Sequence, residues 1–249
     1  MPFLNEGGEP LRTIPLTQVP ATEPYFQLNR PIGFREHDSS ETYWVPAHVP
    51  DDYPARGNRT DLASVPVLFR GFIASYGRQS APAIMHDHHR EVTSRPGTAD
   101  ALTQAEEDDR VFRVGLRQQK VPLLRAWLMW AFVSLERYWL YARLRAVLLV
   151  VQALLAVAVV YGSILLAAGS PLWLLGIGVP AIAALAWGRR YVVMLWLSYG
   201  FPLMAPLVLL QLCALAPYWL AELLVREAID RPFIDHEPGP VAVPFGRAP

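Results

Sequence analysis

The pattern of apolar and polar residues divides the chain into a mixed N-terminal part and an almost wholly apolar C-terminal part. Residues 146–188 are 43 consecutive uncharged positions, and residues 191–221 are 31 more. A helix that crosses a bilayer needs roughly 20 apolar residues. The pattern therefore predicts a transmembrane helical region over 142–225 with about three spans. The expected spans are 146–168, 172–187 and 203–224.

The breaks between these spans are set by glycine and proline. Ala168-Gly169-Ser170-Pro171 separates the first two spans, which form a helical hairpin. Gly200-Phe201-Pro202 interrupts the second uncharged run, so residues 191–199 are expected to be a separate half-helix, either interfacial or buried. A re-entrant pair of short helices is the alternative for this run.

Four arginines predict the orientation of the hairpin. Arg143 and Arg145 precede the first span, Arg189 and Arg190 follow the second, and the turn between the spans carries no cation. Cytoplasmic loops are enriched in Lys and Arg. Both arginine pairs and the N-terminal domain are therefore expected on the cytoplasmic face of a bacterial inner membrane or its equivalent. Three spans place the polar tail, residues 226–249, outside, whereas four spans place it inside.

The N-terminal part has the pattern of a small α+β domain. Residues 1–24 are rich in proline and are interpreted as an extended arm, with a strand leading into the domain as the alternative, and the domain is expected over 25–141. Short apolar runs predict strands near 25–28 and 42–45. Helical periodicity and capping residues predict helices over 80–91, 101–119 and 123–144, the last of which is rich in Trp and continues into the first span.

The distribution of charge narrows the class of protein. The block 142–225 holds four of the 22 cations and one of the 22 acids, so the rest of the chain has 18 cations against 21 acids. This uneven distribution of charge excludes a single soluble globule and a disordered chain. Because cations do not outnumber acids in the polar part, no nucleic-acid partner is expected. Cys213 is the only cysteine, so no intrachain disulfide framework is possible. No secretory signal is apparent in the first 30 residues.

A series of short motifs in the polar part resembles a known family. Thr60-Asp61-Leu62-Ala63-Ser64-Val65-Pro66 is followed by His86-Asp87, then by Asp108-Asp109-Arg110-Val111-Phe112 and by Val121-Pro122. In this order the motifs resemble domain-of-unknown-function family 1353, found in phages, prophages and bacteria, over about residues 25–141. The resemblance implies an aromatic amphipathic helix after these motifs and a phage-related origin, but it supplies no reaction.

The candidate chemistry centres on His86, Asp87 and Asp109. On a helix over 80–91, His86 and His89 lie on one face, and Glu106 and Asp109 have the same spacing on the next helix. Together with Asp61, the residues His86, His89 and Asp109 form a candidate site for a divalent metal that would activate water for hydrolysis. A metal-free site would use His86 as a general base oriented by a carboxylate. The structural alternative is a His–Asp hydrogen-bonded pair that holds the domain together.

Three functional hypotheses fit these observations. The first is a membrane-anchored structural or interaction protein whose partners are the lipid bilayer and other copies of itself in a homo-oligomer or larger assembly. The second is a membrane-tethered hydrolase that uses a divalent metal or the His86–Asp87–Asp109 set. The third is a holin-like protein that permeabilises membranes. The uncharged spans argue against a proton-coupled transporter, because such proteins carry ionisable residues inside the membrane.

Overall fold

The computed structural model describes residues 3–19, 21, 25–37, 40–48, 59–62, 73–74, 76–92 and 100–227. Ala63 to Pro66 of the heptapeptide and the tail at 228–249 lie outside the described residues. The chain divides into two compact units, residues 1–205 and residues 206–249.

The described N-terminal strands form two antiparallel three-stranded sheets. One has the order β1–β4–β5, and the other has the order β2–β3–β6. The strands are β1 (Phe3–Leu4), β2 (Leu16–Gln18), β3 (Phe26–Leu28), β4 (Ile32–Phe34), β5 (Tyr43–Val45) and β6 (Arg59–Thr60). The predicted strands near 25–28 and 42–45 are thus present as β3 and β5.

The predicted arm is not separate from the domain, because it supplies β1 and β2. Phe3 pairs with Phe34 across β1 and β4, and both side chains are buried in one core with Ile84 and Met85. The boundary predicted at residue 24 therefore does not coincide with a break in the packing. Strands β1 and β2 are short and lie in a proline-rich segment, where the alternation that predicts a strand is weak.

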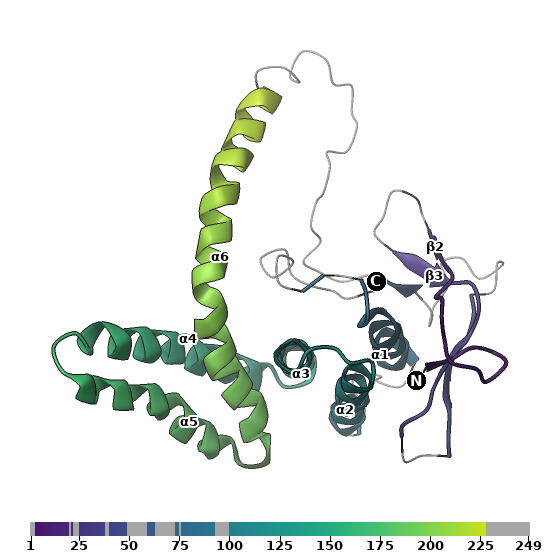
Figure 1. The fold of residues 1–249 in the computed structure, drawn as a ribbon, viewed down its shortest axis with the longest axis horizontal. Coiled ribbons are helices and arrows are strands. Elements are labelled where there is room, and N and C mark those ends of the chain that lie inside the picture. The colour runs from purple at the N-terminus through teal and green to yellow at the C-terminus, as the bar shows by residue number, and fades with distance from the viewer. Residues whose placement is uncertain are drawn as a thin grey trace. The chain divides into compact units, whose positions relative to one another are not determined.

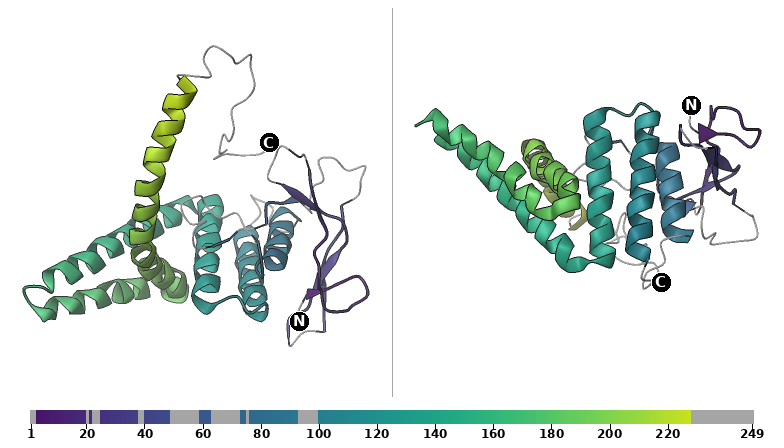
Figure 2. Two further views of the ribbon diagram at one scale, coloured as in Figure 1. Left: turned by 45° about the horizontal axis from the view of Figure 1, so that its top comes forward. Right: turned by 90° about the horizontal axis from the view of Figure 1, so that it is seen from below.

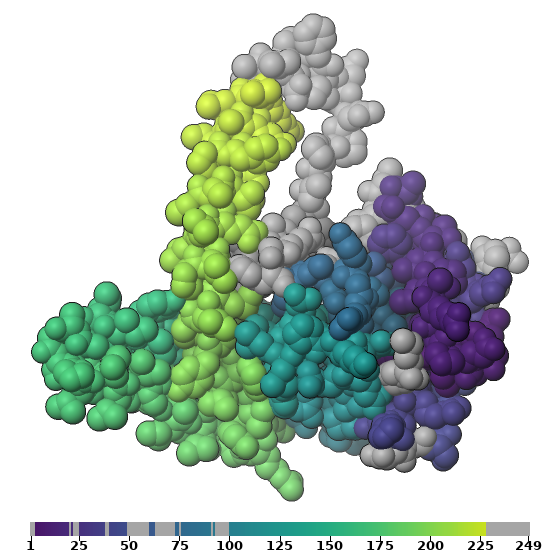
Figure 3. All heavy atoms as spheres, in the orientation of Figure 1, coloured from purple at the N-terminus to yellow at the C-terminus, as the bar shows by residue number. Residues whose placement is uncertain are grey.

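Three helices follow and pack side by side, each against the next (Figure 1). They are α1 (Ser80–Val92), α2 (Ala101–Gln118) and α3 (Leu123–Tyr141). The strands lie beside α1, and α3 lies on the other side of α2 (Figure 2, right). In the space-filling view α1 to α3 (blue to teal) adjoin the strand region (purple) (Figure 3). A small strand region thus precedes a mostly helical remainder.

Helix α2 ends in a Schellman motif that has a lysine where glycine is usual. Lys120 has a φ of 57°. Its N–H donates to the carbonyl of Arg117, and the N–H of Val121 donates to that of Leu116, both at 3.0 Å. Leu116 and Val121 are buried together, as this motif requires. A left-handed backbone costs a residue with a Cβ roughly 1–2 kcal/mol.

The apolar part contains two helical stretches, among the described residues, that are long and apolar enough to cross a membrane, Arg143–Leu166 and Pro171–Val225. The first is α4. The second comprises a 3-10 helix η2 (Pro171–Gly178), α5 (Val179–Ala184), a 3-10 helix η3 (Leu185–Arg190) and α6 (Tyr191–Val225). The predicted number of three spans is not confirmed.

Two details of the predicted apolar elements are wrong. The Trp-rich helix does not run unbroken into the first span, because Ala142, with φ −153° and ψ 61°, separates α3 from α4. Nor is 191–199 a separate half-helix, because α6 continues from Tyr191 to Val225 through Gly200 and Pro202. The turn before α6 lies instead at Gly188, whose backbone is left-handed with a φ of 57°.

Two tyrosines explain why prolines do not interrupt this region. Pro206 has no N–H, so the carbonyl of Pro202, four residues earlier, lacks its helical donor. The Tyr161 hydroxyl donates to that carbonyl at 2.8 Å. Pro180 likewise has no N–H for a 3-10 hydrogen bond to Ile177, and the Tyr199 hydroxyl donates to the Ile177 carbonyl at 2.7 Å. A carbonyl that is shielded from water needs such a replacement donor, because an unpaired buried polar group is costly.

Helix α4 packs against the segment after it through a stripe of mostly small residues. The buried positions on α4 recur every three or four residues: Ala146, Leu149, Ala153, Ala156, Val160 and Ser163. Gly176 faces the end of this stripe, because a Cβ at Gly176 would lie 2.2 Å from the Ser163 hydroxyl oxygen. The predicted helical hairpin is therefore present, with a close contact that requires glycine at 176.

Candidate functional site

Three polar side chains, one from each helix of the domain, meet in its interior. The His86 Nε2 of α1 lies 2.9 Å from Oδ1 of Asp109 on α2. Oδ2 of Asp109 accepts a hydrogen bond from Nη1 of Arg137 on α3. Exposed fractions are 6% for His86, 0% for Asp109 and 3% for Arg137. In this buried triad both oxygens of the carboxylate are occupied, and no member faces solvent.

The helices around the triad fix the orientation of its members. The His86 ring packs on Phe112 with centroids 4.9 Å apart, and the Arg137 guanidinium lies 4.8 Å from the centre of the Tyr138 ring. Nη1 of Arg137 also donates to the carbonyl of Ala105 at 3.4 Å. Charge-assisted hydrogen bonds of this kind offset the cost of burying a carboxylate. The arrangement is therefore suited to joining three helices.

The second histidine of the predicted pair has a different partner. Nδ1 of His89 lies 3.5 Å from Oδ1 of Asp108, which also accepts a hydrogen bond from Gln104 at 3.0 Å. Neighbouring acids on α2 thus contact histidines one turn apart on α1. Among the described residues, no group of three or more His, Cys, Asp or Glu side chains is placed to hold a metal ion. The predicted metal ligands His86, His89, Asp61 and Asp109 are not brought to one point.

Asp87 lies at the contact between α1 and β6. The Thr60 hydroxyl donates to Oδ2 of Asp87 at 2.5 Å and accepts from the N–H of Leu62 at 2.9 Å. Leu62 has a left-handed φ of 70°. Burial raises the pKa of Asp87 well above its usual range, the hydrogen bond from Thr60 opposes this, and the charge of Asp61 raises it further. Asp87 thus binds its proton more tightly in the folded state than in the unfolded chain.

The raised pKa of Asp87 predicts a pH-dependent effect of Asp87→Asn. A carboxyl whose folded pKa is raised contributes stability below its unfolded pKa and loses it as pH rises through the folded pKa. Asparagine keeps an oxygen that accepts from Thr60 but cannot ionise. The Tm of Asp87→Asn is therefore expected to match the wild type at acidic pH and to exceed it as pH rises above the folded pKa.

Glu36→Gln is the control, because the pKa of Glu36 is shifted in the opposite direction and the pH dependence of its Tm difference should be reversed. Hydrogen bonds from Arg110 lower the pKa of Glu36, so its contribution is present at neutral pH and lost as pH falls through the folded pKa. Thermal unfolding of both variants between pH 4 and pH 8 provides the comparison. A Tm difference for Asp87→Asn that does not change with pH would contradict the assignment.

A second set of contacts joins the domain to the apolar helices within residues 1–205. Glu106 of α2 accepts hydrogen bonds from Tyr138 of α3 at 3.4 Å and from Arg190, at the end of η3, at 3.2 Å. Trp127 of α3 stacks on Trp196 of α6 with ring centroids 5.4 Å apart. A Cβ at Gly200 would lie 2.5 Å from Leu128 of α3. We call these contacts the junction.

Arg113 extends the junction to the middle of α2. Its guanidinium lies 4.4 Å from the centre of the Trp127 ring and 4.9 Å from that of Trp130. Burial lowers the pKa of Arg113. Stacking against two indole rings stabilises the cation in this half-buried position. The Trp-rich face of α3 is therefore a packed contact between the domain and α6.

The sequence pattern places some of these residues and misses others. His86 and Asp109 were expected to meet, and they do. The predicted set does not include Arg137 and Thr60, which contact Asp109 and Asp87 respectively. A signal for Arg137 exists in the sequence, because it lies three residues after Ser134 and six after Ala131, on one face of an apolar helix. A single charge on such a face implies a buried partner.

Residues 36–133 match the family described as protein of unknown function (DUF1353). This range lies inside the 25–141 over which the motifs show their resemblance, and it contains all three members of the predicted His86–Asp87–Asp109 set. No curated protein and no solved structure matches the chain.

Proposed function

Because residues 36–133 belong to the DUF1353 family, which has no established activity, we propose a function from the contacts themselves. We propose that the protein is a membrane-anchored structural or interaction protein. In this proposal the family domain lies on the cytoplasmic face of a bacterial inner membrane or its equivalent, and the apolar helices hold it there. A phage or prophage origin and self-association belong to the same proposal.

The observation that carries the proposal is the exposed apolar surface of the helices after residue 143. In the most apolar 18-residue windows of the two long stretches, only 28% and 39% of residues are buried. Large side chains such as Leu144, Leu165 and Leu175 are about three-quarters exposed. The core helix of a soluble protein is mostly buried, and soluble proteins rarely expose apolar patches of this extent. A lipid bilayer is the environment that would bury this exposed apolar surface.

The four arginines support the proposed orientation. Trp187 donates to Gln152 at 2.7 Å, and Ala184 packs with Ala146 and Ala153, so the segment 171–190 returns along α4. Arg143 and Arg145 begin α4, and Arg189 and Arg190 end η3, so both pairs lie at the domain end of the hairpin. The positive-inside rule assigns this end to the cytoplasm.

The proposal predicts how the protein fractionates. We expect the full chain to remain in the membrane pellet after extraction at alkaline pH and to be released by detergent. Protease added to intact spheroplasts is expected to leave the N-terminal domain uncut, whereas the same protease cuts it after lysis. Release by alkaline extraction would contradict the anchor, and cleavage in intact spheroplasts would contradict the orientation alone.

A hydrolase is the second candidate function. The raised pKa of Asp87 favours it, whereas the buried triad does not, because no member of the triad faces solvent. A carboxyl that stays protonated above its usual pH range can act as a general acid, and burial raises the pKa of Asp87. By solvent exposure Asp87 is intermediate, whereas His86 and Asp109 are buried. The proposal predicts turnover of a p-nitrophenyl ester or phosphodiester that is lost in Asp87→Asn while the fold is intact. Equal rates for both proteins would contradict it.

A further inference from the structure

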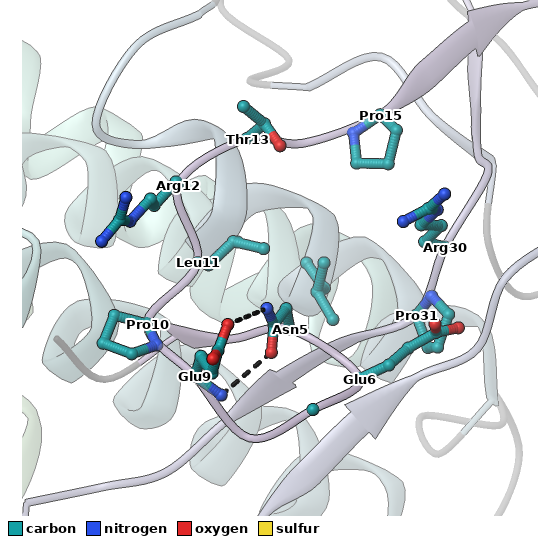
Figure 4. Close-up of a pocket in the computed structure, with 12 residues that line it drawn as sticks. Asn5, Glu6, Glu9, Pro10, Leu11, Arg12, Thr13, Pro15, Arg30 and Pro31 are labelled. Atoms are coloured by element: carbon teal, nitrogen blue, oxygen red, sulfur yellow. Dashed lines mark hydrogen bonds between the residues drawn. The ribbon is translucent and has the colours of Figure 1, made fainter.

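Two hollows in the described surface of the domain differ in charge. The first, about 630 Å³, lies inside the loop of residues 5–15 and is lined by two acids and two arginines (Figure 4). Asn5 and Glu9 are hydrogen-bonded to each other there, and Arg12 and Arg30 lie on opposite sides. Opposite charges balance in this hollow, so it has no preference for a ligand of either sign.

The second hollow, about 740 Å³, is cationic, and we call it the basic pocket. Its charged lining comprises Arg35, Glu36, Arg78 and Lys120. Glu36, the only acid among these lining residues, accepts hydrogen bonds from both terminal nitrogens of Arg110, at 3.0 and 3.1 Å. The three lysine and arginine charges of the pocket are thus not neutralised by its own carboxylate.

Two of the cations are held in place by the fold. Nε of Arg35 donates to the Thr42 hydroxyl at 3.0 Å, and Nη1 of Arg78 donates to the carbonyl of Lys120 at 3.0 Å. A guanidinium has five N–H donors, so one such bond orients it and leaves other donors for a ligand. Paired N–H donors of this geometry match the oxygens of phosphate.

Lys120 supplies an independent observation. It occupies the left-handed position of the Schellman motif, where glycine is favoured. Helix stability alone therefore argues for glycine at this position, and lysine is present against that preference. Backbone strain of this kind is found where a side chain serves another purpose. The side chain that the strain places here is the third cation of the basic pocket.

We propose that the basic pocket binds a phosphate-bearing ligand, with Arg35, Arg78 and Lys120 as its cationic contacts. The proposal does not depend on membrane insertion. The shared chemistry is a phosphate monoester or diphosphate, which either a soluble metabolite or a lipid headgroup can present.

Titration of the full chain in neutral detergent with inorganic pyrophosphate, at fixed ionic strength, tests the proposal. We expect saturable binding by isothermal calorimetry. Lys120→Gly is expected to weaken it about ten-fold or more, as loss of a charged contact does, while its Tm stays equal or rises. A merely structural lysine would give the higher Tm without the weaker binding. Arg78→Gln is expected to weaken binding similarly.

Arg30→Gln is the matched control, because it removes one cation from the other hollow. It is expected to bind pyrophosphate as the wild type does. The absence of saturable binding to the wild type would overturn the proposal. So would equal affinities of wild type and Lys120→Gly, or an equal loss in Arg30→Gln, which would show a general effect of net charge.

A second arm distinguishes the two sources of phosphate. The full chain is placed in nanodiscs of neutral lipid, with or without one-tenth phosphatidic acid, and pyrophosphate is titrated again. Weaker apparent binding in the presence of phosphatidic acid supports a headgroup as the ligand. Unchanged binding supports a soluble phosphate compound. Both results retain the basic pocket as the phosphate site.

Discussion

Replacing Arg137 by methionine is expected to lower the free energy of unfolding of the domain by about 3–5 kcal/mol. Asp109 is fully enclosed, and Arg137 supplies the hydrogen bond to one of its two oxygens. Methionine fills similar space but leaves a buried carboxylate with only the His86 contact. Denaturant titration of the full chain in mild detergent, followed by tryptophan fluorescence, provides the measurement.

Two further variants separate loss of the ion pair from loss of a long side chain. In Arg137→Met combined with Asp109→Asn no uncompensated charge remains, so more than half of the lost stability is expected to return. Arg125→Met, which removes a half-buried arginine of the same helix, is expected to cost much less. A loss below about 1 kcal/mol in Arg137→Met, or no recovery in the double variant, would show that the triad does not stabilise the domain.

Replacing Gly176 by valine is expected to have the second largest effect, a loss of about 1–3 kcal/mol in the packing of the hairpin. A Cβ at this position would lie 2.2 Å from Oγ and 3.3 Å from Cβ of Ser163. The side chains of α4 and η2 must therefore move apart. Thermal unfolding in detergent, monitored by helical circular dichroism, is expected to show a lower Tm.

Gly178→Val is the control for this change, because a Cβ at Gly178 meets no atom within 4 Å. It lies two residues away and carries the same added volume. Ser163→Ala in the Gly176→Val background removes the nearer of the two clashing atoms and is expected to restore part of the lost Tm. Equal Tm values for Gly176→Val and Gly178→Val would rule out the close contact.

The sequence predicts the long elements of the fold and misses the shortest ones. The three domain helices have a clear helical period, and their predicted bounds differ from the observed ones by at most three residues. The strands β1, β2, β4 and β6 have two or three residues, so their pairing depends on partners elsewhere in the chain. The sequence pattern does not predict a continuous α6, because prolines such as Pro202 and Pro206 usually end a helix. In the structure the Tyr161 hydroxyl donates to the Pro202 carbonyl in place of the N–H that Pro206 lacks.

The contact between a histidine and a carboxylate at the candidate site was predictable from the sequence. The burial of this pair under a third helix was not. Spacing on two helices brings His86 toward Asp109, and the structure has this contact. Whether such a pair is open or enclosed depends on a third helix, and the role of Arg137 follows only from the packing of α3 on α2. The predicted metal ligands do not meet at one point, because Asp109 contacts His86 while the neighbouring Asp108 contacts His89.

The single cysteine of the chain, Cys213, tests directly whether lipid surrounds the apolar helices. The Cys213 side chain is exposed on α6, so the protein itself does not shield it. Maleimide that cannot cross membranes is added to inverted membrane vesicles, which present the cytoplasmic face. Lys120→Cys in a Cys213→Ser background serves as the reporter on the domain. We expect labelling of the residue 120 thiol in intact vesicles, and labelling of Cys213 only after the membrane is dissolved. Rapid labelling of Cys213 in intact vesicles would contradict the membrane anchor. Recovery of the protein in the soluble fraction would contradict it as well.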